Sequence, residues 1–281
     1  MKRILVPTDF SEEAFHALEV AISIARKTGA AIKLLNVVEM VPHMTSFTVT
    51  GEVLPPNNMD QVYTLQLLEA TKRRMHDLIQ KVDHQGVHIV QEIEVDRVIS
   101  RIKHVIKDDN VDLVVMGSKG SSGLDEFLIG SNTEKVVRSA TCPVLTIKRR
   151  MRDFDVQEIV LASNFRREVG KAMEHFKRFQ ELFGARVNLV YINTPGAFES
   201  SSNLKQKLEH VANKYGLRNY TINVYNDSVE EDGILHFAKD INADLIMMAT
   251  HSRTGLAHLL SGSIAEDLVN HASRPVLTYQ I

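Results

Sequence analysis

The hydrophobic positions of this chain alternate between short aliphatic runs and longer stretches with helical periodicity. In the first half the segments predicted to be strands occupy residues 4–6, 31–38, 89–95, 113–116 and 144–147, and most of their residues are aliphatic. Runs without polar alternation are typical of strands buried on both faces, and the apolar spacing between them, as in residues 14–25, predicts amphipathic helices. The pattern therefore predicts an α/β fold built on a parallel sheet with helices on both faces.

The same plan is repeated in the second half, where the aliphatic runs occupy residues 159–161, 187–191, 221–224, 245–248 and 276–278. The offset between matching runs is 155 at the start (159 minus 4) and 132 at the end (245 minus 113), so the first half has 23 more residues (155 minus 132) between its first and fourth strands. We place them around Met40 to Gln61, a Pro- and Thr-rich loop. A long helix follows it, with four apolar residues predicted to face inward: Val62, Leu65, Leu68 and Met75.

A glycine motif follows the fourth strand of the first half. Met116 and Gly117 are followed by Lys119 and Gly120, and nine residues later the chain reads Gly130-Ser131-Asn132. Glycine lets a backbone approach a phosphate closely and adopts positive φ without a Cβ clash. This copy of the motif therefore predicts a nucleotide site.

The second copy of the motif, 132 positions later (249 minus 117), has lost part of that chemistry. Ala249 and Ser252 stand where the first copy has Gly117 and Gly120, although Gly262 and Ser263 remain. The aspartate that follows the first strand, Asp9, is replaced by an amide, Asn164. The chain is thus interpreted as a tandem duplication in which residues 1–150 bind nucleotide and residues 151–281 form a second domain with a degenerate site.

Composition narrows the class of protein. A chain of 281 residues that is 44% hydrophobic can form two domains, each with its own core, and a formal net charge of −2 gives no reason to expect nucleic acid or an anionic membrane as a partner. The single cysteine, Cys142, excludes an intrachain disulfide and is interpreted as a small buried apolar residue. The N-terminal residues do not resemble a signal peptide, and no apolar run approaches membrane-spanning length, so we expect a cytoplasmic protein.

The predicted chemistry lies at the carboxyl ends of the strands, where doubly wound sheets bind ligands. Thr8 and Asp9 follow the first strand, and Gly117 ends the fourth. Gly130 and Ser131 begin a helix, whose free N–H groups and positive dipole end favour an anion. Together these turns are expected to flank one crevice that suits a phosphate chain.

The spacing Gly117-x2-Gly120-x9-Gly130-Ser131, with Asp9 after the first strand and Pro143-Val144 at the fifth, resembles the ATP-binding subgroup of the universal stress protein family. The resemblance covers the whole chain as two repeats and implies two tandem doubly wound parallel five-stranded sheets, Rossmann-like and similar to the nucleotide alpha-hydrolase fold. It further implies ATP as the ligand, with or without Mg, and a role as a nucleotide-dependent stress-response regulator or sensor. The residues it assigns to the adenosine, ribose and phosphates are Thr8, Asp9, Val37, Met116, Gly117, Lys119, Gly120, Gly130, Ser131 and Asn132.

Several of these residues have a second interpretation. Asp9 could instead cap the following helix, although Ser11 is an equally good candidate for that role. Ser131 with Glu134 forms a capping-box pattern, which would occupy the serine in the helix rather than with a phosphate. Lys119 is either a phosphate ligand or a solvated surface charge.

No catalytic set or metal site is recognised in the sequence. The twelve histidines form no compact ligand group, and no Walker A lysine or catalytic base accompanies the glycines. A binder with slow or no turnover is expected. The rival hypotheses are a slow metal-dependent ATPase and an interaction scaffold without nucleotide.

The fifth strands of the two halves, residues 144–147 and 276–279, are expected at sheet edges, where exposed aliphatic strands favour aggregation. In family members with one domain per chain, the resemblance implies that two such edges meet across a dimer axis. Here the two halves are expected to pair within the chain as a pseudo-dimer, with the linker at residues 149–153 beside the seam. A homodimer of the whole chain and an unidentified protein partner remain open.

Overall fold

The structure, a computed structural model, describes residues 1–39, 58–118, 130–151, 153–165, 170–250 and 264–281. Its first half contains β1 (Arg3–Pro7), α1 (Glu12–Thr28), β2 (Ala31–Val38), α2 (Asn58–Gln80), β3 (Ile89–Val95), α3 (Val98–Asp108), β4 (Leu113–Gly117), α4 (Ser131–Ser139) and β5 (Val144–Ile147). Side chains of α2 are described from Thr64 onward.

The second half repeats this order of elements. It contains β6 (Glu158–Ala162), α5 (Gly170–Phe183), β7 (Arg186–Asn193), the short 3-10 helix η2 (Pro195–Ala197), α6 (Ser201–Lys214), β8 (Tyr220–Asn226), α7 (Glu230–Asp240), β9 (Leu245–Thr250), α8 (Ile264–His271) and β10 (Val276–Gln280). Every predicted strand is present, and the predicted α/β architecture of two tandem doubly wound halves is confirmed.

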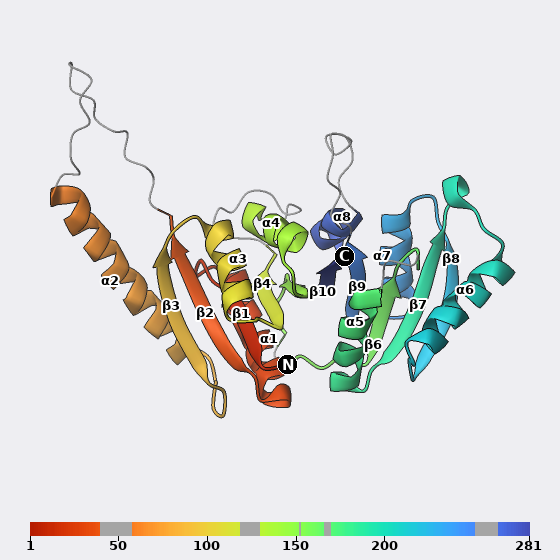
Figure 1. Ribbon diagram of the computed structural model, residues 1–281, viewed down its shortest axis with the longest axis horizontal. Coiled ribbons are helices and arrows are strands. Elements are labelled where there is room, and N and C mark those ends of the chain that lie inside the picture. Colours follow the sequence, from red (N-terminus) through yellow and green to blue (C-terminus); the bar gives the residue numbers. More distant parts are fainter. Residues whose placement is uncertain (40–57, 119–129, 152, 166–169, 251–263) are drawn as a thin grey trace, which may run out of the picture.

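The strands form one ten-stranded sheet in the order β3-β2-β1-β4-β5-β10-β9-β6-β7-β8. Within each half all described pairings are parallel, and only β5 and β10 pair antiparallel. Figure 1 shows the sheet running across the molecule, with α2 at one outer side and α6 at the other. The two half-sheets therefore join through their fifth strands, as the sequence predicts.

The packing differs between the two faces of the sheet. On one face α1, α2, α5 and α6 share a core that continues across the seam and includes Leu145 and Leu277, both fully buried. On the other face α3 with α4 and α7 with α8 cover two separate clusters, one in each half. The apolar contact between the halves is thus concentrated on the α1–α5 face.

Local signals fix the ends of α1, the helix that follows the predicted Asp9 turn. Ser11 is its N-cap and accepts a hydrogen bond from the Ala14 amide, with two glutamates in the first turn. Gly29 ends the helix in the left-handed conformation at φ 69°, where glycine has no Cβ penalty. The start of α1 is therefore set directly beside the carboxyl end of β1.

The linker between the halves is part of the core. Phe154 is 1% exposed and its ring meets Phe183 of α5 edge-on at 5.5 Å, while its carbonyl accepts a hydrogen bond from Ser23 of α1. Arg150 also pairs with Glu19 of α1, at 2.7 Å. The sequence predicted a linker beside the seam but did not indicate that an aromatic residue next to it is buried between α1 and α5.

The prediction for the first-half insertion is partly wrong. Residues 40–57 lie outside the described part of the chain, but α2 has 23 residues and α6 has 14, so a longer helix accounts for part of the extra length. Met75 is fully buried as predicted, whereas Leu65 is 62% exposed. Leu68 is half-buried, the side chain of Val62 lies outside the described residues, and the buried positions of α2 begin at Thr71.

Candidate functional site

A cavity of about 330 Å³ opens at the carboxyl ends of β1, β2 and β4 in the first half. Eight of the ten predicted site residues line it: Thr8, Asp9, Val37, Met116, Gly117, Gly130, Ser131 and Asn132. The other two, Lys119 and Gly120, lie outside the described residues, as do the second-half positions Ser252, Gly262 and Ser263. The structure therefore brings together all of the predicted site residues that it describes.

The cavity has an apolar side and a polar side. Ala14, Leu35, Val37, Val98, Ile102 and Met116 supply the apolar wall. Asp9 is the one ionisable side chain among the described lining residues. An apolar wall with a few converging polar groups is typical of sites for small organic ligands, whose cavities span roughly 300–1,000 Å³.

Asp9 belongs to a tight turn between β1 and α1. Its Oδ1 accepts a hydrogen bond from the Ser11 amide at 3.0 Å, and the Phe10 amide donates to Thr8 Oγ1 at 3.1 Å. Phe10 itself has a positive φ of 66°. Because Ser11 caps α1, the capping role considered for Asp9 is excluded, and the carboxylate instead lines the cavity.

Asn36 of β2 is a site residue that the sequence analysis missed. It is buried, and its Nδ2 donates to the Thr8 carbonyl at 2.7 Å, while the Thr8 amide donates to the Leu35 carbonyl at 2.8 Å. These bonds attach the Asp9 turn to β2. A polar residue within an otherwise aliphatic strand is the signal that could have identified Asn36.

Gly117 is required by packing as well as by any ligand. A Cβ at this position would lie 2.8 Å from the Glu13 carbonyl carbon, so the first turn of α1 can approach β4 this closely only over a glycine. Its φ is not in the left-handed region. Glycine is therefore needed here for the packing of α1 on β4, a reason that the approach of a phosphate does not include.

The start of α4 differs from the predicted capping box. Gly130 is the N-cap and no side chain caps the helix, so Ser131 is its first residue and is exposed. Thr133, another residue missed from the sequence, is buried and donates its hydroxyl to the Gly117 carbonyl at 2.8 Å. The first N–H groups of a helix lack intrahelical acceptors, so those of α4 are available at the cavity wall.

The second half has the same turn after its first strand, but different residues at positions that line the cavity in the first half. Phe165 has a positive φ of 51°, and its amide donates to Ser163 Oγ at 3.0 Å, as Phe10 does to Thr8. Ile192 stands at the position of Val37 and lies against Gly233, where a Cβ would come within 2.5 Å of it. Glu230, the first residue of α7, replaces the apolar Val98 of α3.

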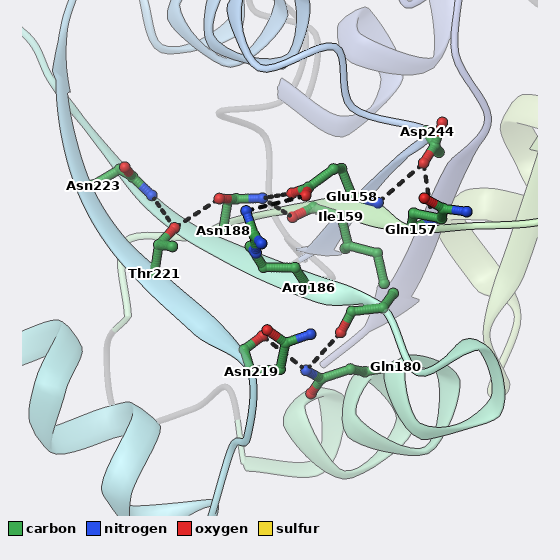
Figure 2. A network of polar contacts seen from close by, with 11 residues as sticks. Gln157, Glu158, Ile159, Gln180, Arg186, Asn188, Asn219, Thr221, Asn223 and Asp244 are labelled. Carbon is green, nitrogen blue, oxygen red and sulfur yellow. Dashed lines mark hydrogen bonds and ion pairs between the residues drawn. The ribbon is translucent and has the colours of Figure 1, made fainter.

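Figure 2 shows a polar network on β6, β7 and β8 that illustrates how the halves have diverged. Asp244 accepts hydrogen bonds from the amides of Gln157 and Glu158, just as Asp112 does from those of Lys2 and Arg3. Next to it the side chains of Glu158, Asn188, Thr221 and Asn223 form a chain of hydrogen bonds. In the first half the position of Asn188 is occupied by Lys33, which pairs with Glu92 and Asp109.

Cys142 is buried, as predicted, and burial raises the pKa of its thiol to about 12. A thiol with that pKa is protonated at neutral pH and is a poor nucleophile.

Among the described residues no group of three or more histidine, cysteine, aspartate or glutamate side chains could hold a metal ion. No described helix is long and apolar enough to cross a bilayer.

Each half of the chain matches a known protein family. The family model described as the universal stress protein family matches residues 1–148 and again residues 156–280. The chain belongs to the universal stress protein family. The two matched ranges correspond to the two halves of the sheet, which confirms the tandem arrangement.

Individual relatives match either one half or the whole chain. Universal stress protein MJ0577 from Methanocaldococcus jannaschii is 30% identical over 155 residues, which cover 53% of this chain and 96% of the relative. Universal stress protein Slr1230 from Synechocystis is 22% identical over the full length of both chains. The crystal structure of a universal stress protein from Archaeoglobus fulgidus has a TM-score of 0.73 at 22% identity and covers 99% of this chain, which shows a shared fold.

Proposed function

We propose that the first half of this universal stress protein binds ATP in the 330 Å³ cavity and that the protein acts as a nucleotide-dependent regulator or sensor in the stress response. The observation that supports this proposal best is the convergence of Asp9, Gly117 and Gly130–Asn132 on that one cavity. These residues come from three separate parts of the chain, so their convergence is a property of the fold.

The chemistry of the cavity matches the parts of a nucleotide. The apolar wall suits the base, the Asp9 carboxylate can accept hydrogen bonds from hydroxyl or amino groups, and the N-terminus of α4 suits a phosphate. Lys119 and Gly120 complete the proposed set of ligand contacts. Mg accompanying the phosphates is part of the proposal, whereas hydrolysis is not.

The second half is proposed to support the first without binding ATP. Asn164 offers no charge at the position of Asp9, and Glu230 adds a carboxylate where the first half has Val98. A carboxylate near that wall would repel the phosphates of a nucleotide. The second domain would thus contribute the β10 edge that covers β5.

The proposal is tested by displacement of a fluorescent ATP analogue from the purified full-length chain. We expect ATP to displace the analogue and Asp9→Asn to weaken ATP binding about tenfold, since the acceptor loses its charge and a hydrogen bond to a charged group is stronger than one to a neutral amide. Asn164→Ala, at the matching position of the second half, is the control and should leave the affinity unchanged. Equal effects of the two variants would contradict the assignment of the site.

The two rival functions give different results in simple assays. A slow ATPase would release phosphate in proportion to protein concentration and only with a divalent metal. A scaffold without nucleotide would purify without any bound nucleotide and would show no thermal shift with ATP. Mass spectrometry of the small molecules released on denaturation separates the scaffold from the ATP binder.

A further inference from the structure

A cation on α2 lies against the turn that contains Asp9. The guanidinium carbon of Arg74 is 4.3 Å from the centroid of the Phe10 ring. Arg74 is exposed and does not line the cavity, and Phe10 does not line it either. The contact therefore joins α2 to the residue that follows Asp9, from outside the proposed binding site.

Phe10 has a backbone conformation that its surroundings must maintain. Its φ of 66° is in the left-handed region, which is unfavourable for a residue with a bulky side chain. Such conformations persist only where several contacts fix them. Here the Phe10 amide is bound by Thr8 Oγ1, the next amide is bound by Asp9 Oδ1, and the ring is covered by Arg74.

Asp9 and Phe10 are adjacent in sequence but contribute to different parts of the first half. The Phe10 ring packs against the core under α1 and α2, where Met75 and Leu78 lie. Asp9 lines the cavity, which α3 and the start of α4 border. A backbone shift at Phe10 would therefore displace Asp9 in the cavity, because the two residues share one peptide bond.

The second half provides an internal comparison. Phe165 occupies the same left-handed position but is 4% exposed, and its ring belongs to the core. The matching helix cation there, Lys207 of α6, lies over Tyr191 of β7 at 5.3 Å instead. Among the described residues, the pairing of a helix cation with the turn phenylalanine thus occurs in the half with the proposed nucleotide site.

We propose that Arg74 is a positioning residue of the nucleotide site, which holds Asp9 in its binding orientation through the ring of Phe10. The identity of the ligand rests on the proposed function, whereas the positioning of the turn does not. The charge of the guanidinium attracts it to the aromatic face, and an uncharged methionine of similar length removes that attraction.

The test compares Arg74→Met with Arg73→Met in the full-length chain. Both variants remove one positive charge from the same helix, and the Arg73 side chain is 81% exposed and pairs with the exposed Glu69 at 3.9 Å. Arg74→Met should weaken ATP binding per folded molecule about two- to fivefold, the size of one exposed cation–π contact, while Arg73→Met should have no effect. Arg74→Lys keeps a cation near the ring, so it should weaken ATP binding less than Arg74→Met does.

A double-mutant cycle shows whether Arg74 acts through Phe10. In the background of Phe10→Leu, which removes the ring, Arg74→Met should cause no further loss of ATP affinity. An equal loss in both backgrounds would overturn the proposal. An equal loss from Arg73→Met would also overturn it, since general attraction of the ATP charge would then explain the effect.

Hydrogen exchange of the Phe10 and Ser11 amides gives a readout without ligand. These amides donate to Thr8 and Asp9 side chains, so Arg74→Met should speed their exchange about two- to fivefold, and Arg73→Met should not. If the wild-type chain binds no ATP, the proposed function fails, and these exchange rates alone decide the positioning role. Unchanged exchange in Arg74→Met overturns it.

Discussion

Thr146 of β5 and Thr278 of β10 donate their side-chain hydroxyls across the seam to each other's strand. Thr146 Oγ1 donates to the Val276 carbonyl at 3.2 Å, and Thr278 Oγ1 donates to the Val144 carbonyl at 3.4 Å. Since 278 minus 146 and 276 minus 144 both equal the repeat offset of 132, the two bonds are related by the pseudo-twofold axis. The axis passes between Leu145 and Leu277, which lie directly opposite each other.

This seam predicts how an isolated first half behaves. Residues 1–150 expressed alone would expose β5, whose four residues are buried in the full chain, and an exposed aliphatic edge strand pairs readily with another. We expect the fragment to self-associate, as measured by light scattering against the full-length chain. A soluble, monomeric fragment at high concentration would show that the edge is protected in another way.

Two substitutions in the Asp9 turn should act separately, one on stability and the other on ATP binding. Ser11→Ala removes the N-cap of α1 and should lower the free energy of unfolding by about 1 kcal/mol without changing ATP affinity per folded molecule. Asp9→Asn should do the opposite, because its amide oxygen can still accept a hydrogen bond from the Ser11 amide. Urea unfolding and ATP titration of both variants check this. If Asp9→Asn destabilises as much as Ser11→Ala, Asp9 is a structural residue.

Gly117→Ala tests the close approach of α1 to β4. The new Cβ would lie 2.8 Å from backbone and side-chain carbons of Glu13, so we expect a loss of about 1–3 kcal/mol in the free energy of unfolding. Gly196→Ala in η2 is the control, since its Cβ would meet nothing within 4 Å. Unfolding curves in urea that place both variants within about 0.5 kcal/mol of wild type would refute the packing argument.

Acid should weaken the ion pairs beneath α3. Burial raises the pKa of Glu92, but hydrogen bonds from Lys33 and Arg101 outweigh it and hold the pKa below its usual value. A lowered folded-state pKa gives stability that is present above the unfolded value, about 4.3, and is lost as the pH falls through the folded one.

Glu92→Gln should therefore be less stable than wild type at pH 7, and the difference should shrink as the pH falls below about 4.3. Chemical denaturation at pH 7 and at several acid values measures it. Glu69→Gln, at an exposed pair on α2, serves as the control and should differ little from wild type at any pH. A Glu92→Gln difference that is the same at all pH values would contradict the role of this carboxylate.

The sequence could predict the parts of this molecule that repeat. Short aliphatic segments between longer stretches with helical periodicity favour buried parallel strands, so the strand cores in both halves were predictable. The carboxyl ends of those strands then fixed where Asp9 and Gly117 would meet. Each of these predictions depends on a local pattern that one sequence contains.

Contacts between distant side chains were not predictable in this way. Asn36 and Thr133 bind backbone carbonyls of neighbouring segments, Phe154 fills a gap between two helices, and the clash at Gly117 involves α1. Leu65 was misassigned because helical periodicity indicates a face but not where along the helix that face meets the core.

We expect the duplicated chain to bind one nucleotide, in its first half. Calorimetric titration of the full-length protein with ATP measures the number of sites directly. One site per chain is expected, because Asp9, Gly117 and the start of α4 occur together in the first half. In the second half Asn164 replaces the aspartate and Ala249 replaces the glycine. Two equivalent sites per chain would contradict the division between the halves, and no binding would contradict the nucleotide site itself.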